Sequence, residues 1–232
     1  MYRRILAAAI LVTAVIVASA APASAQQQSL TFQLGGFMPR GEDGRPAGDV
    51  LVVNRQYLVF DISDFNGVST GGEWAISLGD FFEAGVGVGY FQRTVPTIYD
   101  AWVNNDGSEI EQDLKLRIIP ITAIARILPL GKKRAFQPYV GAGLGIYAWK
   151  YSETGEFVDF HDNSIYRDSY VASGTSVGPV AVFGARGRLS RSFTLGLEVR
   201  LQWGVANLPQ DFLGDKLDLS GTNILSTFTY HF

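Results

Sequence analysis

The chain has 232 residues, of which 47% are apolar, 12% aromatic and 18% charged, with 26 glycines, no cysteine and a formal net charge of -3. This length fits one domain of the larger all-β kind, and the composition is too apolar for a disordered protein. The absence of cysteine excludes disulfide scaffolds and thiolate zinc sites. A pI near 5.4 leaves no broad basic surface, so we expect no nucleic-acid partner.

Residues 1–25 are predicted to be a cleaved signal peptide. Arg3 and Arg4 form a short basic head, residues 5–17 are an apolar run interrupted only by Thr13, and the small residues at 23–25 fit a cleavage site. The alternative is a membrane anchor, but the run is shorter than the roughly 20 residues that span a bilayer. Residues 26–232 then form one exported domain.

The first long connection of this domain contains an apolar stretch, DVLVVNRQYLVFDI, at residues 49–62. A single extra strand here would place the C-terminus on the wrong side of a membrane. The stretch is therefore predicted to form an extracellular hairpin.

Eight strands are predicted from residues that alternate between apolar and polar with period two. The strand near the C-terminal end shows the pattern most clearly, because Leu197 and Val199 alternate with Glu198 and Arg200. Strands of this length suit a tilted crossing of a bilayer, which needs about 9 to 11 residues. The predicted strands are residues 29–39, 71–79, 82–94, 112–128, 137–151, 174–189, 192–204 and 222–232.

The predicted connections alternate in length, at 31, 2, 17, 8, 22, 2 and 17 residues. An up-and-down barrel explains this alternation, because its long loops lie at one rim and its tight turns at the other. The long connections carry 17 acidic and 5 basic residues, and they are expected to face the cell exterior. The sequence predicts an all-β fold, an eight-stranded antiparallel up-and-down transmembrane β-barrel.

The strand at 112–128 has a break in its alternation. Lys115 and Arg117 lie on one face before Pro120, whereas Arg126 lies on the other face after it. A β-bulge at Ile119 and Pro120 would bring all three bases inside, and proline within a sheet is confined to such places or to edges. We therefore predict a bulge there.

The inward faces of the barrel are predicted to carry a network of charges. Eight strands enclose little more than their own side chains, and charges in so narrow a space need partners, so the network is expected to plug the lumen. Glu83 and Glu198 are the expected principal acceptors, and the surplus of bases predicts anion preference if the plug opens. The predicted members are Glu73, Glu83, Arg93, Lys115, Arg117, Arg126, Arg186, Glu198 and Arg200.

The long loop between 151 and 174 contains the only weak indication of catalysis or metal binding. His161 with Ser164 could imitate the site of a lipid-modifying barrel enzyme, but a histidine in such a loop is usually only solvated. A reversible metal site would lack a firm ligand spacing. Its ligands would be Glu153, Glu156, Asp159, His161 and Asp162. No catalytic residue, cofactor or resident metal is predicted.

The C-terminal strand ends in an aromatic pattern formed by Phe228, Tyr230 and Phe232. It resembles the signal by which outer-membrane barrels reach their insertion machinery. Residues 117–151, RIIPITAIARILPLGKKRAFQPYVGAGLGIYAWKY, with PYVGAGLG at 138–145, carry a wider resemblance. The chain is similar to the small eight-stranded outer-membrane barrels of the OmpA/OmpW-like superfamily.

The resemblance implies an outer-membrane location in a Gram-negative cell. The partners it implies are outer-membrane lipids, lipopolysaccharide, the barrel assembly machinery and periplasmic chaperones. It does not fix a role, because such barrels include solute channels, adhesins and structural proteins. A structural or surface-binding role is predicted, the alternative is a narrow passive channel, and a lipid-modifying enzyme is third. The acidic loops either meet lipopolysaccharide through Mg²⁺ or Ca²⁺ or are simply solvated.

Overall fold

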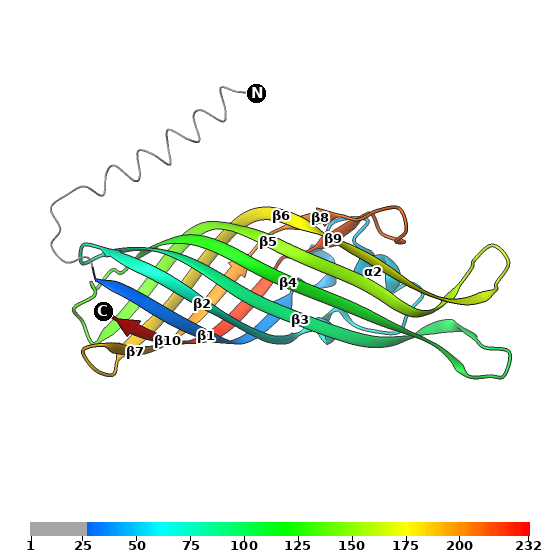
Figure 1. The fold of residues 1–232 in the computed structure, drawn as a ribbon, viewed down its shortest axis with the longest axis horizontal. Helices are drawn as coiled ribbons and strands as arrows, with labels where there is room; N and C mark the ends of the chain where they lie inside the picture. Colours follow the sequence, from blue (N-terminus) through cyan, green and yellow to red (C-terminus); the bar gives the residue numbers. More distant parts are fainter. Residues whose placement is uncertain (1–26) are drawn as a thin grey trace, which may run out of the picture.

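The computed structural model describes residues 27–232, so the predicted signal peptide lies outside the described residues. Eight antiparallel strands pair in sequence order, and β1 completes the ring by pairing with β10 on one side and β2 on the other (Figure 1). This confirms the predicted barrel class. The ring consists of β1 (Gln28–Pro39), β2 (Gly67–Leu78), β3 (Phe82–Val103), β4 (Glu109–Ile127), β5 (Phe136–Val158), β6 (Ile165–Arg188), β7 (Phe193–Gln202) and β10 (Gly221–His231).

The two ends of the barrel differ as the connection lengths predict. The short turns lie at the same end as the C-terminus, whereas the long hairpins lie at the other (Figure 1). Two of the short turns are in contact, because the Lys133 ammonium of the β4–β5 turn lies 2.8 Å from Asp80 of the β2–β3 turn, and its hydrogen bond lowers the pKa of that carboxyl. We call the end with the short turns periplasmic and the opposite end extracellular, from the predicted direction of export.

Strands β3 to β6 are longer than predicted, and they continue past the other strands toward the extracellular end. The predicted loops at 95–111 and 152–173 are therefore short hairpins, at 104–108 and 159–164. Inward alternation persists in the extension of β3, where Val95, Thr97 and Tyr99 are buried. These extensions gain their buried face from two loops that fold over the barrel mouth.

The two loops, residues 40–66 and 203–220, form what we call the cap. The first contains η1 (Glu42–Gly44), α2 (Val50–Asn54) and η2 (Ile62–Phe65), and the second contains β8 (Val205–Asn207) paired with β9 (Lys216–Asp218). None of the described helices is long and apolar enough to cross a membrane.

The predicted hairpin at 49–62 is wrong. Asp49 instead caps α2 by accepting hydrogen bonds from the backbone N–H groups of Leu51 and Val52, and Val50 and Leu51 are fully buried. The apolar run gains its burial inside the barrel mouth, so it needs no partner strand.

The predicted bulge at Ile119 and Pro120 is also wrong. The register between β4 and β5 is constant from Gln112 to Ile127, and Pro120 lies directly opposite Tyr147. Because alternation is unbroken, the inward face that carries Arg126 holds Leu114, Leu116 and Ile118 instead of Lys115 and Arg117.

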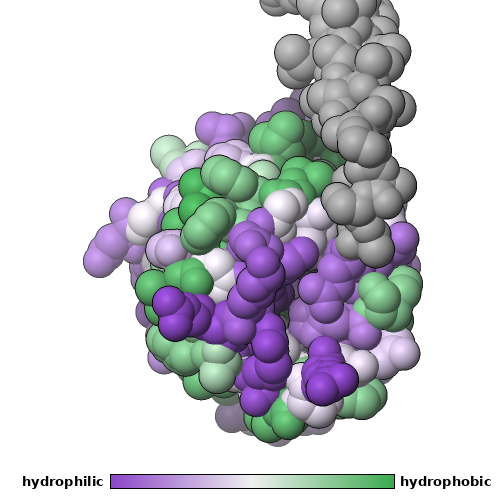
Figure 2. Space-filling model, turned by 90° about the vertical axis from the view of Figure 1, so that its left-hand side faces the viewer, coloured by the Kyte–Doolittle hydropathy of each residue, from purple (hydrophilic) through white to green (hydrophobic). Residues whose placement is uncertain are grey.

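The polarity of the inner and outer faces of the barrel changes along its axis. This change explains why the alternation of β4 is unbroken. Around the periplasmic half, large apolar residues such as Leu34, Leu144 and Leu197 are exposed on the outer face, and the interior is charged. Figure 2 shows this from the periplasmic end, where hydrophilic residues gather at the centre and apolar residues lie around them. Around the extracellular extension the outer face is polar and the inner face is apolar. The outer face meets water there instead of lipid, and the inner face packs against the cap. The predicted polar lumen therefore applies only to the periplasmic half.

Candidate functional site

The lumen of the periplasmic half is filled by ion pairs centred on Glu198. The Arg200 side chain donates to Glu198 Oε1 from Nε at 3.0 Å and from Nη2 at 2.6 Å. Arg126 Nη2 and the Tyr139 hydroxyl each donate to Glu198 Oε2 at 3.0 Å. Glu198 is 1% exposed, so these contacts replace water around its charge.

The other two lumen carboxylates complete the network. Glu73 accepts from both terminal nitrogens of Arg126 and lies 3.4 Å from Arg200 Nη2. Glu83 pairs with Arg186, whose Nε also donates to Gln137 at 2.8 Å. The space that remains among these side chains is a cavity of about 10 Å³, which holds one water molecule at most.

Three predicted members of the network lie outside it. Lys115 and Arg117 point outward from β4, because the predicted bulge is absent. Arg93 lies above the last residue pair between β2 and β3, is exposed, and donates from Nε to the Asp64 carbonyl oxygen at 2.9 Å. The lumen therefore holds three acids and three bases, and the surplus of positive charge that predicted anion preference is absent.

Above this network an apolar layer seals the barrel. Leu114 and Leu116 from β4, with Tyr147 and Tyr151 from β5, are at most 1% exposed and belong to the same buried cluster as Leu51 of α2. The lumen is thus blocked twice, by ion pairs and then by apolar packing.

A buried ion pair fastens the two loops of the cap together. Arg45 donates to both carboxylate oxygens of Asp49, from Nε at 2.8 Å and from Nη2 at 3.2 Å. Arg45 Nη2 also donates to the backbone carbonyl of Asp218 at 2.9 Å, and the Asp218 N–H donates to Asp49 Oδ2 at 2.6 Å. Asp49 therefore caps α2 and holds β9 at the same time.

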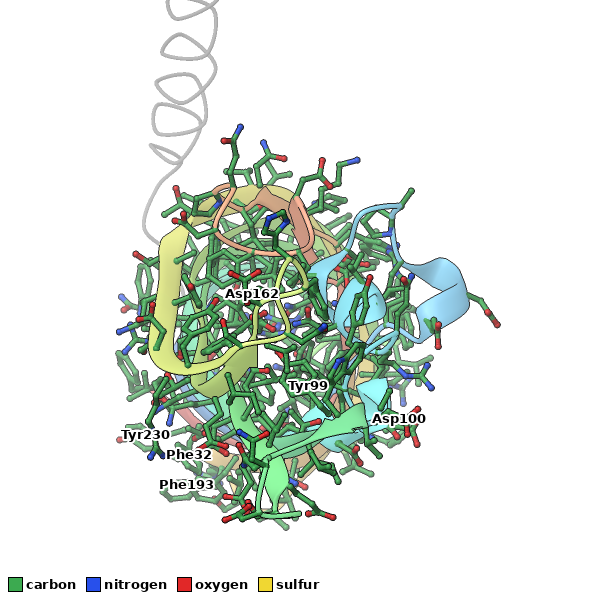
Figure 3. The ribbon with its side chains drawn as sticks, turned by 90° about the vertical axis from the view of Figure 1, so that its right-hand side faces the viewer. Phe32, Tyr99, Asp100, Asp162, Phe193 and Tyr230 are labelled. Atoms are coloured by element: carbon green, nitrogen blue, oxygen red, sulfur yellow. The ribbon has the colours of Figure 1, made fainter. Side chains whose placement is uncertain are left out.

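A pocket of about 250 Å³ lies at the extracellular end, between the cap and the inner face of the strand extensions. Tyr99 lies near the middle of this end, whereas Phe32, Phe193 and Tyr230 lie at the outer edge of the barrel (Figure 3). Aromatic rings dominate the walls, and several are in contact: Tyr57 with Phe160 at 4.9 Å between centroids, and Phe157 with Tyr170 at 5.0 Å. The aromatic lining residues are Tyr57, Tyr99, Phe157, Phe160, Tyr166 and Tyr170.

Glu153 lies in the floor of this pocket, beyond Lys150 and therefore above the lipid-facing part of β5. Its Oε1 accepts hydrogen bonds from Asn54 Nδ2 at 2.6 Å and from the Tyr151 hydroxyl at 2.9 Å. Burial raises the pKa of the Glu153 carboxyl, although those two hydrogen bonds oppose the rise. The contact with Asn54 links α2 of the cap to the barrel wall.

Sequence reasoning placed Glu153 only in a loose loop cluster and missed the pocket. The available indication was the alternation of Tyr151, Glu153, Gly155 and Phe157, which continues the inward face of β5 past residue 151. Within residues 27–232, no group of three or more His, Asp or Glu side chains could hold a metal ion, so Glu153, Glu156, Asp159, His161 and Asp162 do not converge.

His161 and Ser164 lie exposed in the hairpin at 159–164. Their backbone N–H groups donate to Asp159 at 2.8 Å and to Asp162 at 2.9 Å, and none of the hydrogen bonds found in the described residues joins the two side chains. These bonds order the hairpin turn rather than a nucleophile and a base.

A row of bases lies on the outer face, just above the apolar belt. Arg117 of β4 is directly opposite Lys150 of β5, and Lys115 lies two residues farther along β4. Like charges opposite each other across two strands are unfavourable. None of these three bases forms an ion pair within the part of the chain that the structure describes.

The predicted C-terminal aromatic residues lie on the outer face near the periplasmic end. Phe228, Tyr230 and Phe232 are 44%, 43% and 58% exposed. Together with Phe193 they form a chain of ring contacts 5.2 to 5.7 Å apart. Such a cluster is typical of the aromatic girdle of a membrane barrel, while its role as an insertion signal stays a prediction.

Comparison with solved structures shows the fold. OprG of Pseudomonas aeruginosa, an outer membrane protein, superposes with a TM-score of 0.55 at 15% identity, over 90% of this chain and 96% of that one. The N-terminal β-barrel domain of Pseudomonas aeruginosa OprF gives 0.46 at 11% identity, over 89% and 98%. Neisserial surface protein A gives 0.47 at 11% identity, over 89% and 97%.

No protein-family model matches the chain, and no curated protein matches it. The chain thus has the fold of the small outer-membrane barrels. The exposed apolar belt and the aromatic girdle fit a barrel of this fold that crosses a membrane.

Proposed function

We propose that this protein is a closed outer-membrane barrel that binds a ligand at the cell surface. The observation that carries the proposal is the contrast between its two ends. The periplasmic half retains about 10 Å³ of space among its ion pairs, whereas the extracellular end holds a formed pocket of about 250 Å³. A structure blocked twice along its axis and open only at one end favours binding over passage.

Conductance of the refolded protein in a planar bilayer tests the closed lumen. We expect no stable channel from the wild type, and none from Glu198→Ala, because the apolar layer remains above the disrupted ion pairs. Conductance is expected only when the cap is released as well, in Asp49→Ala/Glu198→Ala. A stable wild-type channel would overturn the proposal in favour of the narrow passive channel. A channel from Glu198→Ala alone would show that the cap does not seal.

We also propose that the row formed by Lys115, Arg117 and Lys150 binds phosphate groups of lipopolysaccharide. Its position directly above the apolar belt is where lipid headgroups lie, and an anion between Arg117 and Lys150 would relieve their repulsion. This contact needs no bridging cation. Bridging of the acidic loops by Mg²⁺ or Ca²⁺ stays a separate prediction.

A further inference from the structure

The extracellular pocket has an acidic and aromatic lining, and no Lys, Arg or His side chain is among its lining residues. Its carboxylates are Glu153 in the floor, Asp159 at the end of β5 and Asp211 in the cap. Charges of one sign around a partly enclosed space raise the local concentration of ligands of opposite charge. The lining therefore disfavours an anion and favours a cation.

One lining group lacks a partner. Gln112 of β4 is 3% exposed, and its Oε1 accepts no hydrogen bond from any described residue. A buried acceptor left without a donor is unfavourable, and such groups are rare in native structures. Because Gln112 lines the pocket, a ligand N–H or O–H that reaches its amide group would satisfy this acceptor.

Gly155, the residue opposite Gln112, lies at a close approach of two strand backbones. Gly155 pairs with Gln112 across β4 and β5 and has a φ of +144°, which disfavours any other residue. A Cβ at this position would lie 2.4 Å from the Glu111 carbonyl oxygen. The glycine therefore lets the backbones of β4 and β5 lie close together at Gln112.

We propose that this pocket binds a small organic ammonium ion, whose N–H groups donate to Gln112 Oε1 and Glu153 and whose alkyl part lies against the aromatic walls. Aromatic faces attract ammonium groups, and the carboxylates neutralise the charge. A volume of about 250 Å³ is below the usual range for drug-sized ligands, which limits the ligand to a small molecule. This inference rests on the proposed surface-binding function and gives it a ligand class.

Calorimetric titration of the refolded protein in nanodiscs tests the ligand class. The probes are n-butylammonium, its neutral analogue 1-butanol, butyrate and glucose. We expect saturable binding of n-butylammonium alone, weakened by salt. Equal binding of 1-butanol or glucose would overturn the ammonium assignment, as would the absence of n-butylammonium binding.

One variant tests the acceptor Gln112 and a second tests the acidic lining, and each preserves the size of the side chain. Gln112→Met removes the unpaired acceptor and is expected to weaken n-butylammonium binding about tenfold. Asp211→Asn changes an exposed cap residue outside the barrel wall and should weaken binding by a smaller factor. Asp113→Asn is the matched control, because Asp113 is adjacent to Gln112 and faces outward. Wild-type affinity in Gln112→Met with a correctly folded barrel would overturn the assignment.

The two proposals fail in distinguishable ways. A barrel that does not conduct and does not bind n-butylammonium leaves the closed lumen intact and refutes the ligand class. A conducting wild type refutes the closed lumen, whatever the pocket binds.

Discussion

Replacing Glu198 with glutamine is expected to destabilise the barrel strongly. The substitution keeps the shape of the side chain but removes the charge that Arg126, Arg200 and Tyr139 share. Glu73 would then face two buried guanidinium groups alone. Removing one partner of a buried ion pair costs about 3–5 kcal/mol, because the remaining charge keeps its desolvation penalty. We expect a loss of this size in the free energy of unfolding.

Urea unfolding of the refolded barrel in micelles, followed by tryptophan fluorescence, measures this loss. Glu111→Gln, at an exposed position on the outer face of β4, is the control and should change stability by less than about 0.5 kcal/mol. The double variant Glu198→Gln/Arg200→Gln should lose less than the sum of its single variants, because it removes both charges of one pair. A Glu198→Gln barrel within about 1 kcal/mol of wild type would refute the reasoning, since it would mean that the lumen charges are already solvated.

Three further perturbations address the outer surface of the barrel and the contact between the barrel and the cap. Replacing Phe232 with lysine should reduce heat-modifiable barrel in the outer membrane more than an equivalent change in an extracellular hairpin does; equal yields would contradict the insertion signal. Arg117→Ser/Lys150→Ser should reduce lipopolysaccharide co-purification, whereas Lys133→Ser at the periplasmic end should not. Because the folded state raises the pKa of Glu153, its contribution to cap stability is present below the unfolded pKa and is lost as pH rises through the folded pKa. Protection of α2 from hydrogen exchange, corrected for intrinsic rates, should therefore fall with rising pH in the wild type but not in Glu153→Gln.

The number and order of the strands follow from the sequence because the pattern that defines them is local. Alternation such as that of Glu198 and Arg200 with their apolar neighbours requires only a sheet with two unlike faces. The alternation of long and short connections then orients the barrel, since neighbouring strands pair through the nearest turn. Glu73, Glu83, Arg126, Arg186 and Glu198 lie in the lumen for the same reason.

Only the tertiary structure shows which face of each strand points inward above the membrane. Lys115 and Arg117 follow the same alternation as the lipid-facing residues of β4, but they lie where the outer medium is water. A period-two pattern indicates that the two faces of a strand differ in polarity. It does not indicate whether each face meets lipid, water or protein. The assumption of a polar interior along the whole barrel therefore required a bulge that does not exist.

The cap and the pocket also depend on contacts between residues far apart in the sequence. The apolar run at 49–62 is equally consistent with a hairpin and with a buried helix, and the helix is selected by packing in the barrel mouth and by the contact of Asn54 with Glu153. Whether the amide oxygen of Gln112 finds a donor likewise depends on the segments that the fold places around it, and none of the described residues supplies one. Local sequence patterns determine secondary structure, whereas burial and unmet hydrogen bonds depend on which distant segments the fold brings together.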